Sequence, residues 1–333
     1  MRDEDQLDDR QVTLDDDAYG HLGRLAAGLL AGAPVAEPAG PGEPAVSSGS
    51  YTVDPPFFGD GDIGRLAVCA AVNDLAVEGV EPRWVTLGLT VEAGLPAALL
   101  RRALTSALEA AREAGVDVRG VETRVVRAGD ANRLFAHSTV GGTVPTTPAP
   151  PSPVSPGDVL LLSSPLGGWP VHLLSVREGL GLENLVPSGC HPLNAMLREV
   201  LWSVAPGTVR QVRRIARGGL ARVLQTQASA AGRTVRISEE ALPIPHEVES
   251  AAGLLGIDPL RTTDEGCLCL CVAPGVAEDV RDALRAHPYG REATVIGEVT
   301  DTAVPVALLV ERGGRSQRLD GRSRMRPEPS RLR

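Results

Sequence analysis

A short stretch around residue 60 constrains the fold more than any other part of the sequence. Ser50–Val53 has the composition of a strand, a turn rich in glycine, aspartate and proline follows, and an apolar helix is expected from Gly64 to Glu78. Asn73 and Asp74 interrupt the apolar residues of that helix. Because carboxylates are rarely buried unless they are paired or bind a cation, we interpret Asp74 as a candidate site residue. The alternative is that Asp74 lies on the solvated face of the helix.

Strand and helix signals alternate along most of the chain, which is typical of α/β folds. An apolar stripe over Pro96–Ala114 predicts a helix that covers a sheet. The prolines of residues 145–157 cannot donate ladder hydrogen bonds and predict an extended linker between two α/β halves. We therefore divide the chain into an acidic tail with a short helix and a loop (1–46), a first domain (47–144), the linker (145–157), a second domain (158–311) and a solvated basic tail (312–333).

Further elements are expected from the same signals. In the first domain they are Trp84–Val91, Val116–Val126 and Ala136–Val144. In the second domain the strands are Asp158–Ser163, Thr234–Ile237, Cys267–Val272 and Thr294–Thr300, and the helices are Pro170–Glu178, Pro192–Val204, Gly218–Ala231, Pro245–Leu255 and Gly275–Ala286. The short N-terminal helix is expected over Ala18–Leu30.

Composition excludes several kinds of chemistry. The sequence contains no lysine, and all 33 basic residues are arginine. A Walker-type phosphate lysine and a Schiff-base lysine are therefore excluded. Any phosphate contact must come from arginine, from backbone amides or from a metal ion. The net charge of −9 argues against non-specific binding of nucleic acid, which needs a basic face.

Neither a membrane span nor a secretory signal is expected, because the sequence has no apolar run of 18 residues and its N-terminus is acidic. The five cysteines lack the spacing of a disulfide framework, so we expect a cytoplasmic protein. Cys267, Cys269 and Cys271 alternate and would share one face of a strand, as small buried residues rather than metal ligands. Cys190 and His191 suggest a nucleophile and a base, but adjacent residues rarely face each other productively.

Several motifs occur in an order that indicates a family. Besides the stretch around residue 60 they are Glu92–Pro96, Ala107–Gly115, Arg177–Leu180, Arg217–Leu220 and Leu284–Pro288. From about Ser47 to about Val299 the chain resembles the HypE family, the carbamoyl dehydratases of nickel–iron hydrogenase maturation. That family belongs to the PurM-like superfamily of aminoimidazole ribonucleotide synthetase and selenophosphate synthetase. The resemblance implies an α/β (α+β) fold of two domains, in which paired N-terminal domains form a dimeric, barrel-like sheet and ATP lies in the cleft between the domains.

The resemblance also implies a mechanism. In the HypE family ATP phosphorylates the oxygen of a thiocarbamate on a C-terminal cysteine, and dehydration gives a thiocyanate. This reaction needs a glycine-rich phosphate loop, carboxylates that hold magnesium, and the terminal thiol.

Some positions of the family's nucleotide site are retained in this sequence. Asn73 and Asp74 are kept, Glu122 replaces an aspartate that other relatives also replace by glutamate, and Arg124 replaces a lysine of different geometry. Asp74 and Glu122 are therefore the expected magnesium ligands. The remaining expected cofactor-binding residues are Arg217, Gly218 and Gly219, at a helix start that suits an anion, and Glu265.

Other positions are changed. Gly49 and Arg214 replace acids, Gly168-Trp169 replaces an Asp-His pair, Asp15–Asp17 replace the glycine-rich loop, and the sequence ends Glu328–Arg333 without the family's terminal cysteine. Gly20–Gly23 is the alternative position for a displaced remnant of the loop. Three aspartates would repel phosphate, at about 1 kcal/mol for like charges 4 Å apart in water. We therefore expect ATP and magnesium to bind weakly or not at all.

Two hypotheses remain open from the sequence. We favour a HypE-like scaffold with a degraded ATP and magnesium site, which docks a protein partner in a maturation or biosynthetic pathway. The alternative is a diverged ATP-dependent carbamoyl or amide dehydratase that acts on a substrate in trans. A homodimer through residues 50–144 is expected under both, because an isolated sheet of this fold would leave an apolar face exposed.

Overall fold

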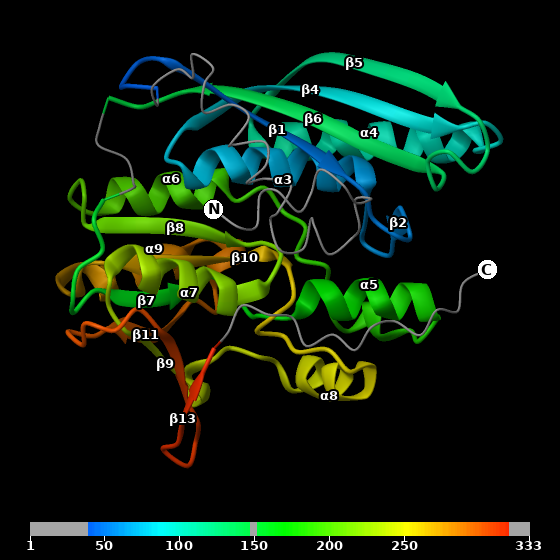
Figure 1. Cartoon of the computed structure of the whole chain (residues 1–333). Coiled ribbons are helices and arrows are strands. Elements are labelled where there is room, and N and C mark those ends of the chain that lie inside the picture. Colours follow the sequence, from blue (N-terminus) through cyan, green and yellow to red (C-terminus); the bar gives the residue numbers. More distant parts are fainter. Residues whose placement is uncertain (1–38, 147–151, 320–333) are drawn as a thin grey trace, which may run out of the picture. The chain divides into compact units, whose positions relative to one another are not determined.

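The computed structural model describes residues 39–146 and 152–319 (Figure 1). Residues 41–333 form one compact unit, and the unit before it is described only at residues 39 and 40. Three expectations therefore lie outside the described residues. They are the acidic tail, the helix over Ala18–Leu30, and the two alternative positions of the glycine-rich loop, Asp15–Asp17 and Gly20–Gly23. No helix of the described ranges is long and apolar enough to cross a membrane.

The first sheet has four strands in the order β1-β6-β4-β5. Their bounds are β1 Pro44–Tyr51, β4 Glu81–Glu92, β5 Asp117–Val126 and β6 Leu134–Thr143, and a small ladder joins β2 Phe57–Phe58 to β3 Gly61–Asp62. Only β4 and β5 run parallel. Strand β1 begins inside the region expected to be a loop, because Pro44 already pairs with Thr143.

Helices α3 (Ile63–Val77) and α4 (Ala97–Ala114) cover one face of this sheet (Figure 1). The carboxylate of Asp62 caps α3 by accepting hydrogen bonds from the amides of Gly64 and Arg65, at 2.9 and 3.2 Å. A Cβ atom on Gly64 would lie 2.0 Å from the carbonyl oxygen of Ala103, so the two helices approach closely only because glycine is there.

The opposite face of the first sheet carries no helix in the described part of the chain. It carries polar pairs, with Ser48 Oγ 2.8 Å from Thr139 Oγ1 and Ser50 Oγ 3.1 Å from His137 Nδ1, and it also carries Val46, which is 66% exposed. The face is therefore mixed, with polar and apolar side chains. The homodimer itself stays a prediction.

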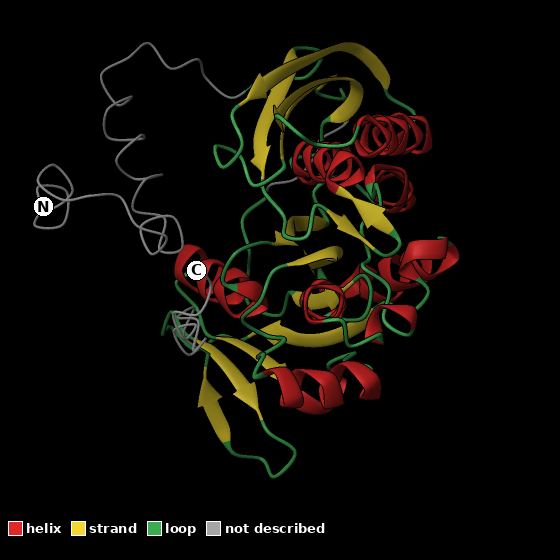
Figure 2. Cartoon of the chain, turned by 90° about the vertical axis from the view of Figure 1, so that its right-hand side faces the viewer, coloured by secondary structure: helices red, strands yellow, loops and turns green. Residues whose placement is uncertain are grey.

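The second sheet has seven strands in the order β13-β12-β9-β11-β7-β10-β8, antiparallel except between β9 and β12. Its strands are β7 Val159–Leu162, β8 Val209–Ile215, β9 Val235–Ser238, β10 Asp264–Val272, β11 Thr294–Val299, β12 Ala307–Val310 and β13 Ser316–Arg318. The helices of this half are α5 Gly168–Glu178, α6 Asn194–Ser203, α7 Gly219–Ala231, α8 His246–Leu255 and α9 Ala277–Ala286. Helices lie on both sides of this sheet, which Figure 2 shows in yellow below the first sheet.

Buried side chains explain this layering. Leu197 of α6 and Leu284 of α9 pack with Leu161 on one face, whereas Leu224 of α7 packs with Leu162 on the other. Strand alternation places neighbouring leucines of β7 on opposite faces. Cys267, Cys269 and Cys271 all lie in the core under α7, which confirms their interpretation as small buried residues of a strand.

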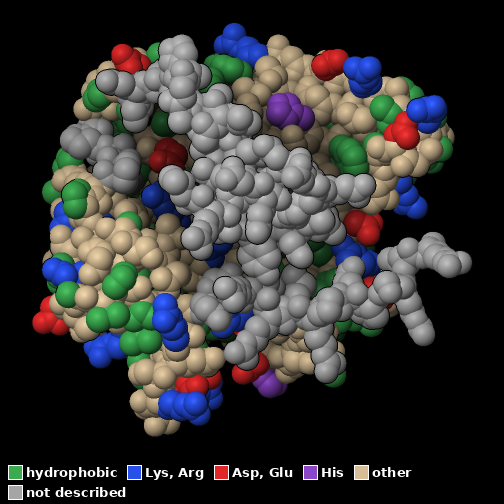
Figure 3. All heavy atoms as spheres, in the orientation of Figure 1, with side chains coloured by type: hydrophobic (Ala, Val, Ile, Leu, Met, Phe, Trp, Pro, Cys, Tyr) green, Lys and Arg blue, Asp and Glu red, His purple; other side chains and the backbone are tan. Residues whose placement is uncertain are grey.

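Two parts of the second half differ from the sequence-based expectation. Strand β8 was not expected, because its sequence contains three arginines among its apolar residues. The basic tail expected from Arg312 is exposed as far as Arg318, but Ser316–Arg318 also form β13 beside β12, and Leu319 is buried. Where Figure 3 shows side chains in colour, arginines and carboxylates are interspersed rather than gathered in one basic patch.

Helix α3 connects the two halves. Besides the first sheet it contacts α6 and β8 of the second half, and Ala76 and Val77 at its end belong to the core that α6 and α9 cover. The Asn-Asp pair of α3 therefore lies where the two halves meet.

Candidate functional site

Arg214 lies between two carboxylates that the sequence marks as site residues. One terminal guanidinium nitrogen, Nη1, donates a hydrogen bond to Asp74 Oδ1 at 2.5 Å, and the other nitrogen, Nη2, forms a short ion pair with Glu265. Nη1 also lies 3.3 Å from the carbonyl oxygen of Ala70 in α3. The arginine of β8 thereby joins a carboxylate of α3 to a carboxylate of β10.

The electrostatics of this cluster favour the charged arginine. Burial opposes the charge, but the carboxylates of Glu265 and Asp74 hold the pKa of the Arg214 guanidinium above its ordinary value. The side chains of Arg214 and Glu265 are each 13% exposed, so their attraction is only weakly screened. The Nε atom of Arg214 is buried without a hydrogen-bond partner.

Asp74 differs from the expectation of a buried carboxylate. Its side chain is 41% exposed, whereas the neighbouring Asn73 is buried. Its carboxylate is nevertheless paired. The pairing partner is an arginine of the same chain.

Asn73 connects the halves of the molecule. Its amide nitrogen donates to the carbonyl oxygen of His191 at 2.9 Å, and its amide oxygen accepts from the amide of Leu193 at 2.7 Å. Both ends of the side chain are therefore used by the backbone that leads into α6. This arrangement explains a buried asparagine in an apolar helix without a ligand.

Gly49 lies beside Tyr51, two residues further along β1 on the same face. A Cβ atom on Gly49 would lie 2.2 Å from the hydroxyl oxygen of Tyr51 and 2.6 Å from its ring carbon Cζ. Burial, together with the nearby carboxylates of Asp74 and Glu265, raises the pKa of Tyr51 to about 12. The phenol thus occupies the space into which an acidic side chain at position 49 would project.

Glu122 and Arg124 lie on another part of the first half. Glu122 pairs with Gly88 of β4, which in turn pairs with His137 of β6. Ser138 points toward α3, because its hydroxyl donates to the carbonyl oxygen of Ala67 at 2.7 Å. Alternation then places His137 and Glu122 on the helix-free face, away from Asp74. The structure does not bring the two expected magnesium ligands together within one chain.

Arg217, Gly218 and Gly219 lie at the start of α7, as expected. Gly218 is the N-cap with a φ angle of 90°, and a Cβ atom on Gly219 would lie 2.4 Å from the carbonyl oxygen of Leu260. The amide of Gly219 donates to the carbonyl oxygen of Ala216 at 2.9 Å. Close packing and turn geometry therefore account for both glycines without an anion.

Asp264 is a buried acidic residue that the sequence did not single out. Its buried carboxyl group accepts hydrogen bonds from the amides of Gly167 and Gly266, at 2.8 and 3.1 Å. Burial is the main cause that raises its pKa to about 7. The side chain joins the turn before α5 to the start of β10. Trp169 in the first turn of α5 packs edge-on against Phe58 with ring centroids 5.2 Å apart.

Cys190 and His191 take part in packing between the halves. Arg65 of α3 donates to the carbonyl oxygen of Cys190 at 2.7 Å, and the ring of His191 stacks on Tyr289 with centroids 4.0 Å apart. A contact with Cys69 and burial raise the pKa of the Cys190 thiol well above its ordinary value. Such a thiol is a poor nucleophile, as expected for this pair.

The residues present do not fit a magnesium ion between α3 and β10. Within the described ranges no group of three histidine, cysteine, aspartate or glutamate side chains is placed to hold a metal. Asp74 and Glu265 already share a guanidinium, which supplies the positive charge that a divalent cation would bring. The sequence indicated Arg214 only by its difference from the HypE family, which has an acidic residue at the corresponding position.

Both halves of the chain match models of known protein families. Residues 34–144 match the family described as "AIR synthase related protein, N-terminal domain", and residues 155–309 match "AIR synthase related protein, C-terminal domain". The two matches follow each other in the order of the two sheets.

Individual proteins and solved structures that resemble this chain belong to one family within that class. Carbamoyl dehydratase HypE of Escherichia coli (strain K12) is 39% identical over 261 residues, which cover 77% of this chain and 76% of that protein. A solved HypE–HypF complex matches with a TM-score of 0.78 and 33% identity over 83% of this chain and 90% of the other. A HypE structure in complex with ATP matches with a TM-score of 0.79 and 31% identity over 93% and 97% of the two chains. The chain belongs to the HypE family of hydrogenase maturation proteins.

Proposed function

We propose that this chain is a HypE-type maturation protein whose nucleotide site is closed by Arg214, and that it acts as a scaffold that docks a protein partner. The observation that supports the proposal most directly is the position of Arg214, between Asp74 and Glu265. A HypE relative has been solved in complex with ATP, so loss of nucleotide binding would separate this chain from that relative.

The physical argument rests on charge. A magnesium ion beside the guanidinium of Arg214 would meet a like charge in a site where Glu265 is only 13% exposed. Releasing the arginine would leave it without its charge-assisted hydrogen bonds, which contribute roughly 1.5–3 kcal/mol each. Magnesium and ATP would have to offset both effects, and Gly49 offers no carboxylate to help.

The partners are part of the proposal. A relative forms a complex with HypF, and we propose a partner of that kind for this chain. We also propose a homodimer through the helix-free face of the first sheet, where Ser48, Ser50, Thr139 and His137 offer polar groups for pairing. Glu122 and Arg124 lie toward the same face, so a second copy would bring its own Glu122 to the interface.

The second candidate is an ATP-dependent carbamoyl or amide dehydratase that acts in trans. Retention of Asp74, Glu122, Arg217 and Glu265 favours it. This candidate requires the carboxylate of Asp74 or Glu265 to exchange Arg214 for a bound cation when nucleotide enters.

Thermal unfolding with and without magnesium distinguishes the two candidates. The test variant combines Gly49→Asp, Tyr51→Leu and Arg214→Asp, which removes the guanidinium and makes room for the acid at position 49. Millimolar magnesium should raise the Tm of this variant and leave the Tm of the unmodified chain unchanged, because only the variant has unpaired carboxylates at the site. The matched control is Arg213→Asp, which changes the neighbouring arginine that pairs with Glu78. An equal rise in the unmodified chain would contradict the scaffold proposal.

A further inference from the structure

A cavity of about 310 Å³ lies in the second half of the chain, where the start of β10 meets the first turn of α5. Trp169 of α5, Val248 of α8 and Tyr289, which follows α9, contribute to its wall. Its volume is at the lower end of the range of small-molecule sites, roughly 300–1,000 Å³. The cavity contains neither Arg214 nor the two carboxylates that pair with it.

The charged side chains of this wall are acidic. Asp264, Glu247 and Glu292 line the cavity, and no arginine is among the described residues that do so. Neither glutamate forms an ion pair within the described ranges. His191 also lines the cavity, but burial and the guanidinium of Arg65 lower the pKa of its imidazole, which is therefore neutral at pH 7. The cavity thus carries negative charge without a counter-charge from its own wall.

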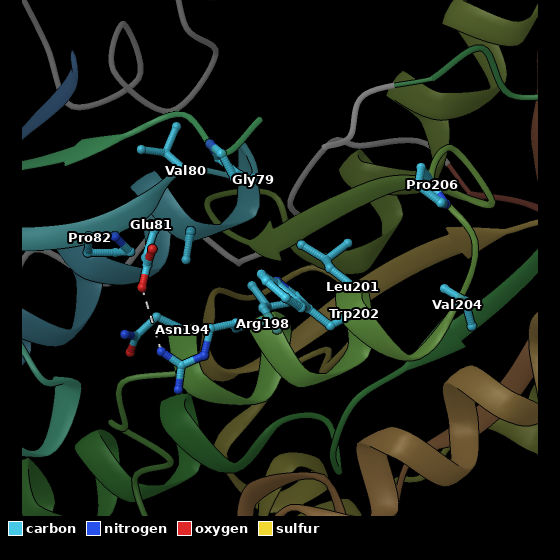
Figure 4. A pocket seen from close by; sticks show the side chains of 13 residues that line it. Gly79, Val80, Glu81, Pro82, Asn194, Arg198, Leu201, Trp202, Val204 and Pro206 are labelled. Carbon is cyan, nitrogen blue, oxygen red and sulfur yellow. Dashed lines mark ion pairs between the residues drawn. The ribbon is translucent and has the colours of Figure 1, made fainter. Parts of the chain in front are cut away.

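The hollow between the end of α3 and the side of α6 differs in this respect (Figure 4). There Glu81 Oε1 lies 3.7 Å from Arg198 Nη1, the ion pair that is marked in Figure 4. The other carboxylate oxygen of Glu81 accepts a hydrogen bond from Arg83 at 2.8 Å. The charges of that hollow are engaged with one another, so they do not select a charged ligand.

Asp264 is the most deeply buried carboxyl group of the cavity. It is 4% exposed, whereas Glu247 and Glu292 are exposed. Backbone amides at the start of α5 and of β10 donate to its oxygens, but no arginine or histidine of the described chain forms an ion pair with it. A buried carboxylate is costly without a cation, and a cation in the cavity would reduce this cost.

The arrangement of the carboxyl groups favours an organic cation over a metal ion. Among the described residues no three histidine, cysteine, aspartate or glutamate side chains are placed to hold a metal. The wall also offers apolar and aromatic surface from Trp169, Val248 and Tyr289. Apolar groups pack against such a surface, and aromatic rings attract cations. An ammonium group on a small apolar body therefore matches the cavity.

We propose that this cavity binds a small organic amine in its protonated form, with the ammonium group at Asp264 and the apolar body against Trp169 and Val248. The ammonium group donates hydrogen bonds to the carboxylate of Asp264. The exposed carboxylates of Glu247 and Glu292 add a weaker, solvent-screened attraction. The titration of magnesium-ATP involves none of these residues, so this proposal and the proposed function can fail separately.

The charge requirement is tested with benzylamine as the probe, by ligand-observed NMR on the full chain at pH 7.5. Benzyl alcohol has the same ring and a similar size but no charge. Benzylamine should bind saturably in the millimolar range, and at least tenfold more tightly than benzyl alcohol, which is about 1.4 kcal/mol. Absence of saturable benzylamine binding, or equal binding of the two probes, would overturn the proposal.

The location of the site is tested with variants. Asp264→Asn keeps the size of the side chain and should weaken benzylamine binding at least tenfold, with little effect on benzyl alcohol. Glu292→Gln, at an exposed position that does not affect the core, should weaken benzylamine binding about twofold. Asp301→Asn removes an exposed carboxylate outside the cavity and should leave the binding of both probes unchanged. Unchanged benzylamine affinity in Asp264→Asn, or an equal loss in Asp301→Asn, would overturn the assignment to this cavity.

Discussion

Arg214 Nη1 lies 2.5 Å from Asp74 Oδ1, although the two residues are 140 positions apart in the sequence. The contact joins α3 of the first half to β8 of the second half. With Glu265 as its second partner, Arg214 supplies the positive charge of the site from within the chain. In the unmodified protein one guanidinium therefore holds two carboxylates together.

Removal of this guanidinium should destabilise the protein. Arg214→Met keeps a long side chain but leaves Glu265 buried and unpaired. Breaking a buried ion pair typically costs about 3–5 kcal/mol, and we expect a value near the lower end because Asp74 is half-exposed. Urea unfolding measures the change. Arg213→Met is the matched control, because its pair with Glu78 is exposed and contributes less than about 1 kcal/mol. An equal loss of unfolding free energy in the two variants would show that the ion pairs of Arg214 stabilise the protein no more than the exposed pair of Arg213.

Position 49 should tolerate a side chain only when Tyr51 is smaller. Gly49→Ala places a Cβ atom against the phenol, and such overpacking typically costs about 1–3 kcal/mol. In the Tyr51→Leu background the same substitution should cost much less. A double-mutant cycle measures the coupling between the two sites, which should reach at least about 1 kcal/mol. Strictly additive effects would mean that Tyr51 does not fill this space.

Asp264 should make stability depend on pH. Its pKa is raised to about 7 in the folded protein, whereas an unfolded aspartate titrates near 3.9. The protonated form is thus favoured on folding, so this contribution is fully present below about pH 4 and is lost as the pH rises to about 7. At about 1.4 kcal/mol per unit the loss is at most roughly 4 kcal/mol.

The measurement is the free energy of unfolding of the unmodified chain and of Asp264→Asn between pH 4.5 and 7.5. The difference between the two proteins should shrink as the pH rises. A difference independent of pH would show that Asp264 does not titrate in this window.

The helix-free face of the first sheet should form the homodimer. Thr139→Arg places a large charge in the middle of that face, where Thr139 contacts Ser48. Sedimentation at micromolar concentration should show a dimer for the unmodified chain and a monomer for this variant. Thr226→Arg on the exposed side of α7 serves as the control and should remain dimeric. A monomeric unmodified chain would remove the prediction.

Much of the fold was predictable from local patterns. Helix α3 and the stripe of α4 follow from apolar periodicity, and Asp74 stands out because an Asn-Asp pair interrupts an apolar helix. Strand β8 was not predictable, because its arginines are half-buried only through contacts with residues far away in the sequence. The sequence likewise shows that an arginine replaces the family's acid at position 214. It does not show that this arginine contacts Asp74, because the two residues are far apart in the sequence.

The site could be predicted only in part. Gly49 indicated a missing carboxylate, whereas the phenol that fills its space comes from a residue with no special pattern of its own. Asp74 and Glu122 were expected to share a metal, but strand alternation and the position of α3 separate them. Such relations depend on which face of a sheet a helix covers, and local sequence patterns do not fix that.

Calorimetric titration of magnesium-ATP into the unmodified chain tests the central claim most directly. Loss of two charge-assisted contacts, at about 1.5–3 kcal/mol each, would weaken binding by roughly a hundredfold or more. With Arg214 closing the site, we predict no saturable heat of binding at micromolar nucleotide. A low-micromolar Kd for magnesium-ATP would contradict the account and would favour the ATP-dependent enzyme instead.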